Sequence, residues 1–364
     1  MKLTAKREEL LAPLQSVIGV VERRQTMPVL ANVLLSARDK RLAVTGTDLE
    51  VELVAATGVH VEMPGDVTVP GRKLLDILRA LPGGVDVTLS SEAERATVRA
   101  GRSRFTLATL PASEFPVLEE IHAQQTLALP QSEFRRLIDK THFSMAQQDV
   151  RYYLNGLLLE TQDSTLRAVA TDGHRLALCD MPLGEPARSG QVIVPRKAVL
   201  ELQRILAAEG SIELAIGTNH IRAQIGDIRF TSKLIDGRFP EYGRVIPENP
   251  PKVAQADREL LRQALQRTAI LSNEKYRGIR MGIKRDLLTL QAHNPEHEEA
   301  EDQIEVSYAG EEVEIGFNVN YLLDALGAIE TDQVELGFAD ANSSCLIRAP
   351  GLGQARYVVM PMRL

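Results

Sequence analysis

Apolar residues along the chain follow two alternating spacings. Near the N-terminus they recur every three or four positions, which predicts one face of an amphipathic helix, at Leu10, Leu11, Leu14, Val17, Ile18 and Val21. The segment 41–55, RLAVTGTDLEVELVA, instead alternates apolar and polar residues, as a half-buried strand does. Helical spacing returns further on, at Phe134, Leu137 and Ile138 and again at Leu260, Leu261, Ala264 and Leu265. The chain therefore mixes short helices with many strands.

The same succession of patterns occurs three times. The strand 41–55 aligns with LRAVATDGHRLALCDM at 166–181, which places Asp48 on Asp172. A third copy, LLTLQAHNPEHEEAEDQIEV at 287–306, places Asn294 at the same position. The segments 66–89, 191–216 and 314–338 form a second aligned set, and Phe105, Phe230 and Tyr357 mark a third. Three features in one order at one period indicate a threefold internal repeat.

The repeats predict three domains, at 1–124, 125–243 and 244–364. We expect each to open with a helix, continue in alternating strands, and add a second short helix before the last strands. In the first domain the second helix is marked by Leu74, Leu75, Leu78 and Leu81. The fold class is α+β, with six helices in the chain and antiparallel sheets.

Composition narrows the classes of protein that fit. The 364 residues are 44% hydrophobic, include no Trp, and carry a net charge of −7, so a globally basic nucleic-acid-binding protein is excluded. Cys179 and Cys345 are the only cysteines, too few for a disulfide framework, which favours a reducing compartment. The charged N-terminus and the lack of a long apolar run predict a cytoplasmic protein without a membrane span.

Two features leave nucleic-acid binding open. The second helix of the first two repeats begins with paired basic residues, Arg72-Lys73 and Arg196-Lys197, and the segment QQDVRYYLNG at 147–156 joins adjacent tyrosines to an arginine. The helices could present a phosphate-binding face or only a solvated one. The tyrosines could stack on bases, or they could enter the following strand and pack.

Two further segments look catalytic. The segment TDGHRL at 171–176 brings an Asp, a His and an Arg together, and HNPEH at 293–297 matches a zinc-protease spacing. However, Asp48 and Asn294 occupy the position of Asp172 in the other repeats, which favours a recurring turn over a catalytic acid. Pro295 argues against a metal-binding helix, and no phosphate-binding loop is encoded. A catalytic pair of His174 and Arg175 stays as an alternative to a surface groove.

Taken together, the repeat and its motifs resemble the bacterial DNA polymerase III beta subunit family. The resemblance covers the whole chain, and the motifs that carry it are TDGHRLA, QDVRYYLNG, SNEKYRG, DGRFPEY and the C-terminal YVVMPMRL. It implies a DNA-clamp domain in three tandem copies, each with two helices packed on antiparallel sheets, and a ring-shaped head-to-tail homodimer. The protein would be a non-catalytic sliding clamp that needs no cofactor.

The same resemblance implies the partners. The ring would encircle double-stranded DNA and primer–template junctions without reading sequence, which suits contacts to phosphates. DNA polymerases, the clamp loader, and mismatch-repair and ligase-type proteins would bind through short linear peptides. The DNA contacts carried over to this chain are Arg24, Arg72, Gln148, Tyr152, Tyr153, Arg196 and Lys197. A scaffold that binds partners but not DNA is the alternative that charge reversal at Arg24, Arg196 and Lys197 would test.

The peptide groove implied by the resemblance lies between the second and third domains. Its positions here are Leu154, Thr171, Gly173, His174, Arg175, Leu176, Pro240, Arg244, Val245, Val358, Met360, Pro361, Met362 and Arg363. Methionines in such a groove can adapt to varied apolar side chains.

Ring closure is expected to join a basic edge of the first domain to an acidic edge of the third, since unlike patches meet in a head-to-tail interface. The positions are Lys73, Arg102, Arg104, Phe105 and Leu107 on the first edge, and Ile270, Leu271, Glu298, Glu299 and Glu301 on the second.

Overall fold

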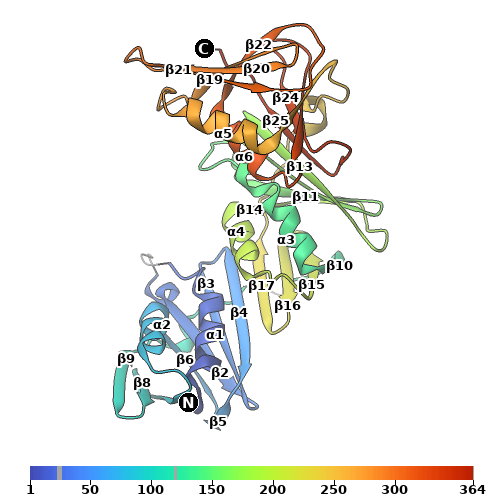
Figure 1. Ribbon diagram of the computed structural model, residues 1–364. Helices are drawn as coiled ribbons and strands as arrows, with labels where there is room; N and C mark the ends of the chain where they lie inside the picture. Colours follow the sequence, from blue (N-terminus) through green and yellow to red (C-terminus); the bar gives the residue numbers. More distant parts are fainter. Residues whose placement is uncertain (23–26, 119–120, 364) are drawn as a thin grey trace. The chain divides into compact units, whose positions relative to one another are not determined.

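The computed structural model describes residues 1–22, 27–118 and 121–363 (Figure 1). In this part of the chain six α-helices occur, two in each repeat, as the sequence predicts. They are α1 (Arg7–Val17), α2 (Gly71–Ala80), α3 (Gln131–Asp139), α4 (Arg196–Ile205), α5 (Arg258–Ala269) and α6 (Val319–Gly327).

Each repeat contributes two groups of antiparallel strands. The first group holds the strands that follow the first helix and precede the second. Its members are β2 (Asn32–Arg38), β3 (Arg41–Thr47), β4 (Val51–Gly58) and β6 (Gly65–Pro70); β11 (Gly156–Gln162), β12 (Thr165–Thr171), β13 (Arg175–Pro182) and β14 (Gly190–Pro195); and β19 (Gly278–Lys284), β20 (Leu287–His293), β21 (Glu299–Glu305) and β22 (Val313–Asn318).

The second group combines the first strand of a repeat with its last three. Its members are β1 (Lys2–Lys6), β7 (Asp86–Glu92), β8 (Arg95–Ala100) and β9 (Ser103–Ala108); β10 (Gln125–Pro130), β15 (Ser211–Ile216), β16 (His220–Ile225) and β17 (Ile228–Lys233); and β18 (Lys252–Asp257), β23 (Gln333–Phe338), β24 (Cys345–Arg348) and β25 (Ala355–Val359). In the first repeat β5 (His60–Met63) adds a strand beside β1.

Neighbouring repeats share sheets. Strand β17 of the second repeat pairs with β4 of the first, and β25 of the third pairs with β13 of the second, so two continuous eight-stranded sheets form. Phe230 lies opposite Leu53, and Tyr357 lies opposite Ala177. Leu53 and Ala177 follow the turn residues Asp48 and Asp172 at the same distance in sequence, so both junctions use one register. A five-stranded sheet ends in β9, and a four-stranded sheet ends in β21.

The chain divides into two compact units that do not coincide with the repeats. One contains Met1–Ser132 and Lys197–Leu234, and the other contains Glu133–Arg196 and Ile235–Leu364. Each unit holds one of the eight-stranded sheets, and the middle repeat is split between them. The domain boundaries predicted from the repeats remain a prediction.

Three sequence-based expectations are wrong. Each repeat opens with a strand, β1, β10 or β18, and not with its helix. Helix α1 ends at Val17, and beyond it the N–H groups of Val20 and Val21 bond to the carbonyls three residues before them, as in a turn. Leu260 is 55% exposed, since the buried stripe of α5 runs through Leu261, Ala264, Leu265 and Thr268, and Leu260 lies about 100° away around the helix.

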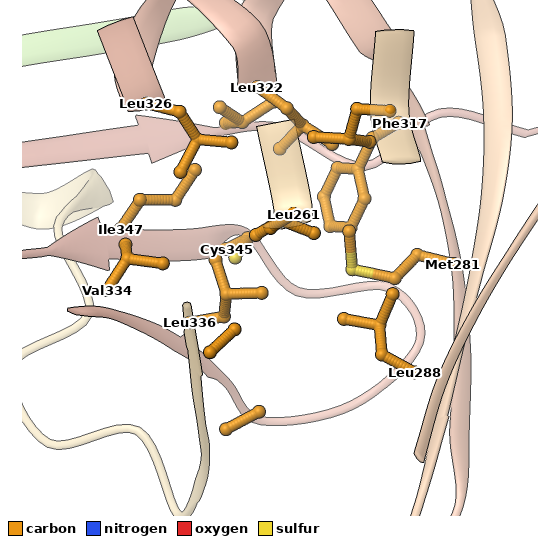
Figure 2. Close-up of a cluster of buried hydrophobic side chains, with 14 of the residues drawn as sticks. Leu261, Met281, Leu288, Phe317, Leu322, Leu326, Val334, Leu336, Cys345 and Ile347 are labelled. Carbon is orange, nitrogen blue, oxygen red and sulfur yellow. The ribbon is translucent and has the colours of Figure 1, made fainter. Parts of the chain in front are cut away.

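The core of the third repeat shows how the layers pack. Leu261 from α5 and Leu322 and Leu326 from α6 point between two sheets (Figure 2). Phe317 and Met281 come from the four-stranded sheet and Ile347 from the eight-stranded one. All six are at most 2% exposed, so α5 and α6 fill one core between the two sheets. Among the described helices none is long and apolar enough to span a bilayer.

Candidate functional site

The segment 171–176 forms a tight turn held by side-chain hydrogen bonds. Asp172 Oδ1 accepts from the backbone N–H groups of His174 and Arg175 at 2.9 and 3.0 Å. Thr171 Oγ1 accepts from the N–H of Gly173 at 3.1 Å and donates to the carbonyl of Arg175 at 2.6 Å. Gly173 has φ +88°, a left-handed conformation that favours glycine. The predicted turn is confirmed, and Asp172 serves it as an acceptor.

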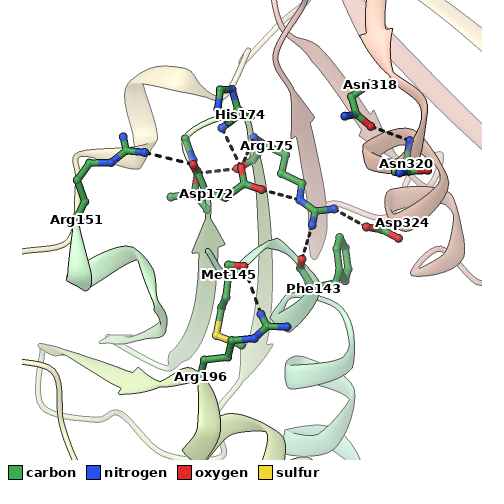
Figure 3. Close-up of polar contacts among 12 residues, drawn as sticks. Phe143, Met145, Arg151, Asp172, His174, Arg175, Arg196, Asn318, Asn320 and Asp324 are labelled. Carbon is green, nitrogen blue, oxygen red and sulfur yellow. Dashed lines mark hydrogen bonds and ion pairs between the residues drawn. The ribbon is translucent and has the colours of Figure 1, made fainter. Parts of the chain in front are cut away.

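Arg175 is the centre of a partly buried polar cluster (Figure 3). Its guanidinium donates to Asp172 at 3.1 Å, to Asp324 of α6 at 2.5 Å and to the carbonyl of Phe143 at 2.6 Å. It also lies over the ring of Tyr321, 4.5 Å from the centroid. The side chain is only 13% exposed. Arg175 therefore links the turn to α6 and is not free to act as a catalytic acid.

A cavity of about 170 Å³ opens beside this turn. Its walls bring together many of the groove positions predicted from the sequence: Leu154, Thr171, Gly173, Arg175, Leu176, Pro240, Val245, Val358 and Met360. Strands β13 and β25 supply the floor through Leu176 and Val358, and the 3₁₀ helix Tyr242–Val245 stands on one side. The cavity is mainly apolar, so it suits aliphatic or aromatic side chains.

The other five predicted groove positions lie outside the cavity wall. His174 is exposed, and its carbonyl accepts a hydrogen bond from the N–H of Met360 at 2.9 Å. The N–H of Met362 donates to the carbonyl of Gly316 at 2.8 Å, which ties the end of the chain to β22. Arg244 and Arg363 are exposed, and Pro361 is half-buried.

Three wall residues were not among the predicted positions: Arg151, Glu241 and Tyr242. Arg151 had been considered only for nucleic acid, as part of QQDVRYYLNG. Its guanidinium is held by Asp149 at 2.9 and 3.0 Å, and this contact lowers the pKa of Asp149 to about 2. Tyr242 lies in the motif that contributes Pro240, and its hydroxyl donates to Glu160. Their place beside Pro240 was the signal that could have identified Glu241 and Tyr242, whereas Arg151 had no such signal.

The predicted DNA contacts on the helices are already engaged with the protein. Lys197 Nζ binds Glu22 at 2.7 Å and Asp48 at 2.5 Å. Burial lowers the pKa of Lys197, but the hydrogen bonds to Asp48 and Glu22 outweigh it and raise the pKa overall. Arg196 donates to the carbonyl of Met145 at 3.3 Å, and Arg72 donates to the carbonyl of Val21 at 2.8 Å. Arg24 lies outside the described residues.

The remaining predicted DNA contacts lie between α3 and β11. Gln148 is exposed and has φ +56°. Tyr152 is 58% exposed, whereas Tyr153 is half-buried and packs against a cluster that includes Leu176 and Val358. Both tyrosines precede β11, so neither enters the strand. The exposed ring of Tyr152 is available for stacking, and Tyr153 also supports the groove floor.

The predicted dimer residues lie at two sheet ends. On the first domain's edge, β9 carries the exposed Arg104, the half-buried Phe105 and the buried Leu107, and Arg102 is exposed just before it. Lys73 is exposed in the first turn of α2. Ile270 is 75% exposed directly after α5, and Leu271 is half-buried. Glu298, Glu299 and Glu301 are exposed on or just before the terminal strand β21.

HNPEH forms the turn between β20 and β21, where Asn294 Oδ1 accepts from the N–H of Glu298 at 2.9 Å. Over the described ranges, no cluster of three or more His, Cys, Asp or Glu side chains is arranged to hold a metal ion. Burial raises the pKa of the Cys179 and Cys345 thiols to about 11 and about 12, which suits packing and not nucleophilic chemistry.

Three repeats joined through shared sheets, with helices on one side and an apolar cavity beside a junction, define the DNA-clamp class of proteins. The chain matches the family models described as DNA polymerase III beta subunit, N-terminal domain, over residues 1–119, central domain over 128–241, and C-terminal domain over 243–363. It is 55% identical to the beta sliding clamp of Pseudomonas putida and 52% identical to that of Escherichia coli K12, with both chains covered completely.

Solved structures give the same result. The DNA polymerase III subunit beta of Pseudomonas aeruginosa is 54% identical, with a TM-score of 0.98 and complete coverage of both chains. A sliding clamp of the same species bound to griselimycin has a TM-score of 0.97 at 54% identity, again with complete coverage of both chains. The chain belongs to the bacterial DNA polymerase III beta subunit family. It is a DNA sliding clamp, a non-catalytic subunit of the replicative DNA polymerase.

Proposed function

We propose that two chains close head-to-tail into a ring around duplex DNA, through a third junction built like the two inside each chain. One observation carries this: β17 pairs with β4, and β25 with β13, in the same register, while their counterparts β9 and β21 end their sheets without a partner strand in the described structure. A free strand edge is a template for pairing with another chain. The missing partner of β9 is β21 of a second copy.

The internal register predicts the new contacts. His293 pairs with Glu299 as Thr171 pairs with Leu176, so Ala300 corresponds to Ala177. Because Ala177 lies opposite Tyr357, Phe105 is expected opposite Ala300, which sets Arg104 opposite Glu301. Opposite charges facing each other across two strands stabilise pairing, and like charges would oppose it.

An aromatic contact supports the same alignment. At the second internal junction Phe143, just after α3, stacks on Tyr357 with ring centroids 5.9 Å apart. Thr141 and Thr268 both bond to the carbonyl four residues before them, so Phe143 corresponds to Ile270. Phe105, the counterpart of Tyr357, would then cover the exposed Ile270 of the other chain. Leu107 and Leu271 extend the apolar centre. In this register Glu298 and Glu299 fall opposite Leu107 and Thr106, and Arg102 falls opposite Gln303, so the exposed Lys73 and Arg102 add to the basic edge without a directly opposed acid.

Sedimentation of the purified chain tests the junction. Arg104→Glu is expected to shift the dimer to monomer by at least tenfold in dissociation constant, because it places two acids across the strands. Glu301→Arg in the same chain should restore the dimer. Arg285→Glu, at an 87% exposed position in the turn between β19 and β20, is the matched control. A wild-type chain that stays monomeric at micromolar concentration would refute the proposed ring.

Within the ring, the helices are proposed to face DNA. Arg72, Arg196 and Lys197 lie at or next to the start of α2 and α4, and Gln148, Tyr152 and Tyr153 lie after α3; Arg24 belongs to the same set. Such contacts read phosphates and not bases, so the ring can slide. The Arg196→Glu, Lys197→Glu double variant should lose retention on nicked circular DNA after loading while still sedimenting as a dimer. Unchanged retention on DNA would mean that these basic residues are only solvated and do not contact DNA.

The apolar cavity is proposed to bind the short peptides through which polymerases, the clamp loader, and mismatch-repair and ligase-type proteins attach in the cytoplasm. Its apolar floor and its position on the sheet face opposite the α-helices support this, and so does the relative that binds griselimycin. Val245→Asp should weaken peptide binding at least tenfold, because it places a charge in an apolar wall. Val253→Asp is a control at matched exposure, 39% against 37%. Equal losses in both variants would refute the assignment.

A further inference from the structure

A second cavity, of about 190 Å³, lies on the same sheet face as the peptide groove. Its floor contains Leu178 of β13 and Leu346 of β24, and its rim contains Arg348 and Arg356. Leu178 follows Leu176 by two residues on β13, and Arg356 precedes Val358 by two on β25. Because side chains two apart on a strand share a face, the two cavities lie next to each other along these strands.

Tyr242 separates the two cavities and lines both. The segment that carries it continues to Ile246, Pro247 and Glu248, which form the outer wall of the second cavity. Tyr242 is held in place by its hydroxyl, which donates to Glu160 and accepts from Arg167 at 3.4 Å. A peptide that leaves the first cavity past Tyr242 therefore enters the second without crossing a sheet edge.

The charges around the second cavity are unevenly satisfied. Two arginines share the single carboxylate of Asp180, which accepts from Arg167 at 2.6 and 2.9 Å and from Arg356 at 3.2 Å. Arg348 contacts Glu335 through Nε at 2.8 Å. For Arg348 and Arg356 these are the hydrogen bonds that the described structure contains, so most of their donors have no protein acceptor. Glu248 is the one carboxylate in the cavity wall, and it is exposed at the rim.

We propose that this second cavity takes a carboxylate carried by the partner peptide, as an Asp or Glu side chain or a chain terminus, just beyond its apolar anchor. Arg348 and Arg356 would supply the donors, since guanidinium groups bind carboxylates through charge-assisted hydrogen bonds. Leu178 and Leu346 would cover the methylene groups. The inference rests on the peptide groove proposed above and adds to it a recognition element for acidic extensions.

Fluorescence polarisation with the full-length chain tests this. Three labelled, C-terminally amidated peptides share a Leu-Phe anchor; one ends there, one continues with Asp-Asp and one with Asn-Asn. The Asp-Asp peptide should bind about fivefold to tenfold more tightly than the Asn-Asn peptide at low salt, and the advantage should shrink as salt rises. Equal affinities of the Asp and Asn peptides for the wild-type chain would overturn the inference.

Two variants locate the effect. Arg348→Gln should reduce the Asp-over-Asn advantage to less than about twofold, while Arg285→Gln, which removes the same charge elsewhere, should leave it intact. Glu248→Gln should enlarge the advantage, because it removes a competing carboxylate. An advantage that survives Arg348→Gln would also overturn the inference. If the anchor-only peptide fails to bind at all, the proposed groove is wrong, and that result is distinct from the loss of the acidic preference alone.

Discussion

The turn at Thr47–Val51 and the turn at Thr171–Arg175 share the same hydrogen bonds but connect to their surroundings in opposite ways. In both, the Asp Oδ1 accepts two backbone N–H groups and the Thr hydroxyl bridges the turn. Asp48 then receives a cation from the helix side, Lys197 of α4. Asp172 instead binds Arg175, the first residue of β13, which also binds the carboxylate of Asp324 on α6.

The comparison separates what the repeat requires from what it leaves open. The backbone of the turn must be the same for β4 and β13 to accept the next repeat in one register. The second carboxylate oxygen, Oδ2, carries no such constraint. Its cation can come from a helix, as Lys197 does for Asp48, or from the following strand, as Arg175 does for Asp172. In the second repeat the cation sits on the strand, so a partly buried guanidinium lines the groove. The first turn has no such guanidinium on its strand, because its cation, Lys197, comes from helix α4.

The largest expected difference is between Asp172→Ala and Asp48→Ala. Removing Asp172 leaves two backbone N–H groups and a 13% exposed guanidinium short of an acceptor, which should cost about 3–4 kcal/mol in free energy of unfolding. Asp48→Ala should cost about 1–2 kcal/mol, since Lys197 is 37% exposed and keeps Glu22. Urea denaturation measures both. Equal losses would show that the two ion pairs contribute alike.

A smaller effect is expected from Gly173→Ala. At φ +88° an alanine is strained, and its Cβ would lie 3.0 Å from Nη2 of Arg151, which can move aside. We expect a loss of about 1–2 kcal/mol and weaker peptide binding, because Arg151 lines the groove. Thermal melting and peptide titration test the two parts. A variant as stable as the wild type would show that this turn tolerates a side chain, as the first turn tolerates Leu49.

The contribution of Lys197 to the stability of the first turn should depend on pH. The pKa of Lys197 is raised on folding, so its contribution to stability is present below the unfolded pKa and is lost as pH rises through the folded pKa. Lys197→Gln should therefore lower stability by roughly 0.5–1 kcal/mol near neutral pH, and the difference should disappear as pH rises through the folded pKa of Lys197. Denaturation of both proteins across this range measures it. A difference that persists at high pH would mean that the lysine acts through packing and not charge.

The smallest expected effect is at Leu49, which has φ +78° where the second turn has Gly173. Leu49→Gly relieves this strain but loses contacts with the small cluster around Leu30 and Phe115. We expect the two to offset each other to within about 1 kcal/mol, measured by urea denaturation. A loss well beyond that would assign Leu49 to the core and not to the turn.

Much of this could be read from the sequence because the repeat supplies three versions of each segment. The recurrence of Asp48, Asp172 and Asn294 identified the turn. Helical spacing identified four helices, and the repeat alignment supplied the other two. The opening strands were missed because five or six residues such as KLTAK alternate too briefly to stand out. Leu260 was misplaced because neighbouring leucines on a helix do not share a face.

The candidate site was harder to predict. Its apolar wall residues could be assigned by resemblance, whereas Arg151 enters it through a turn whose geometry no spacing encodes. The engagement of Arg175 with Asp324 could not be foreseen either, because it joins segments far apart in the chain. Residues that act through long-range contacts need the fold before their role can be recognised.

The two eight-stranded sheets have a mechanical consequence. Each crosses a border between repeats with a full ladder of hydrogen bonds, so a repeat border within the chain is held as firmly as a strand inside one repeat. In the ring that we propose, the two joints without a covalent link are those where β9 of one chain would meet β21 of the other. A force that pulls such a ring open would separate β9 from β21 first. The two eight-stranded sheets of each chain would stay intact.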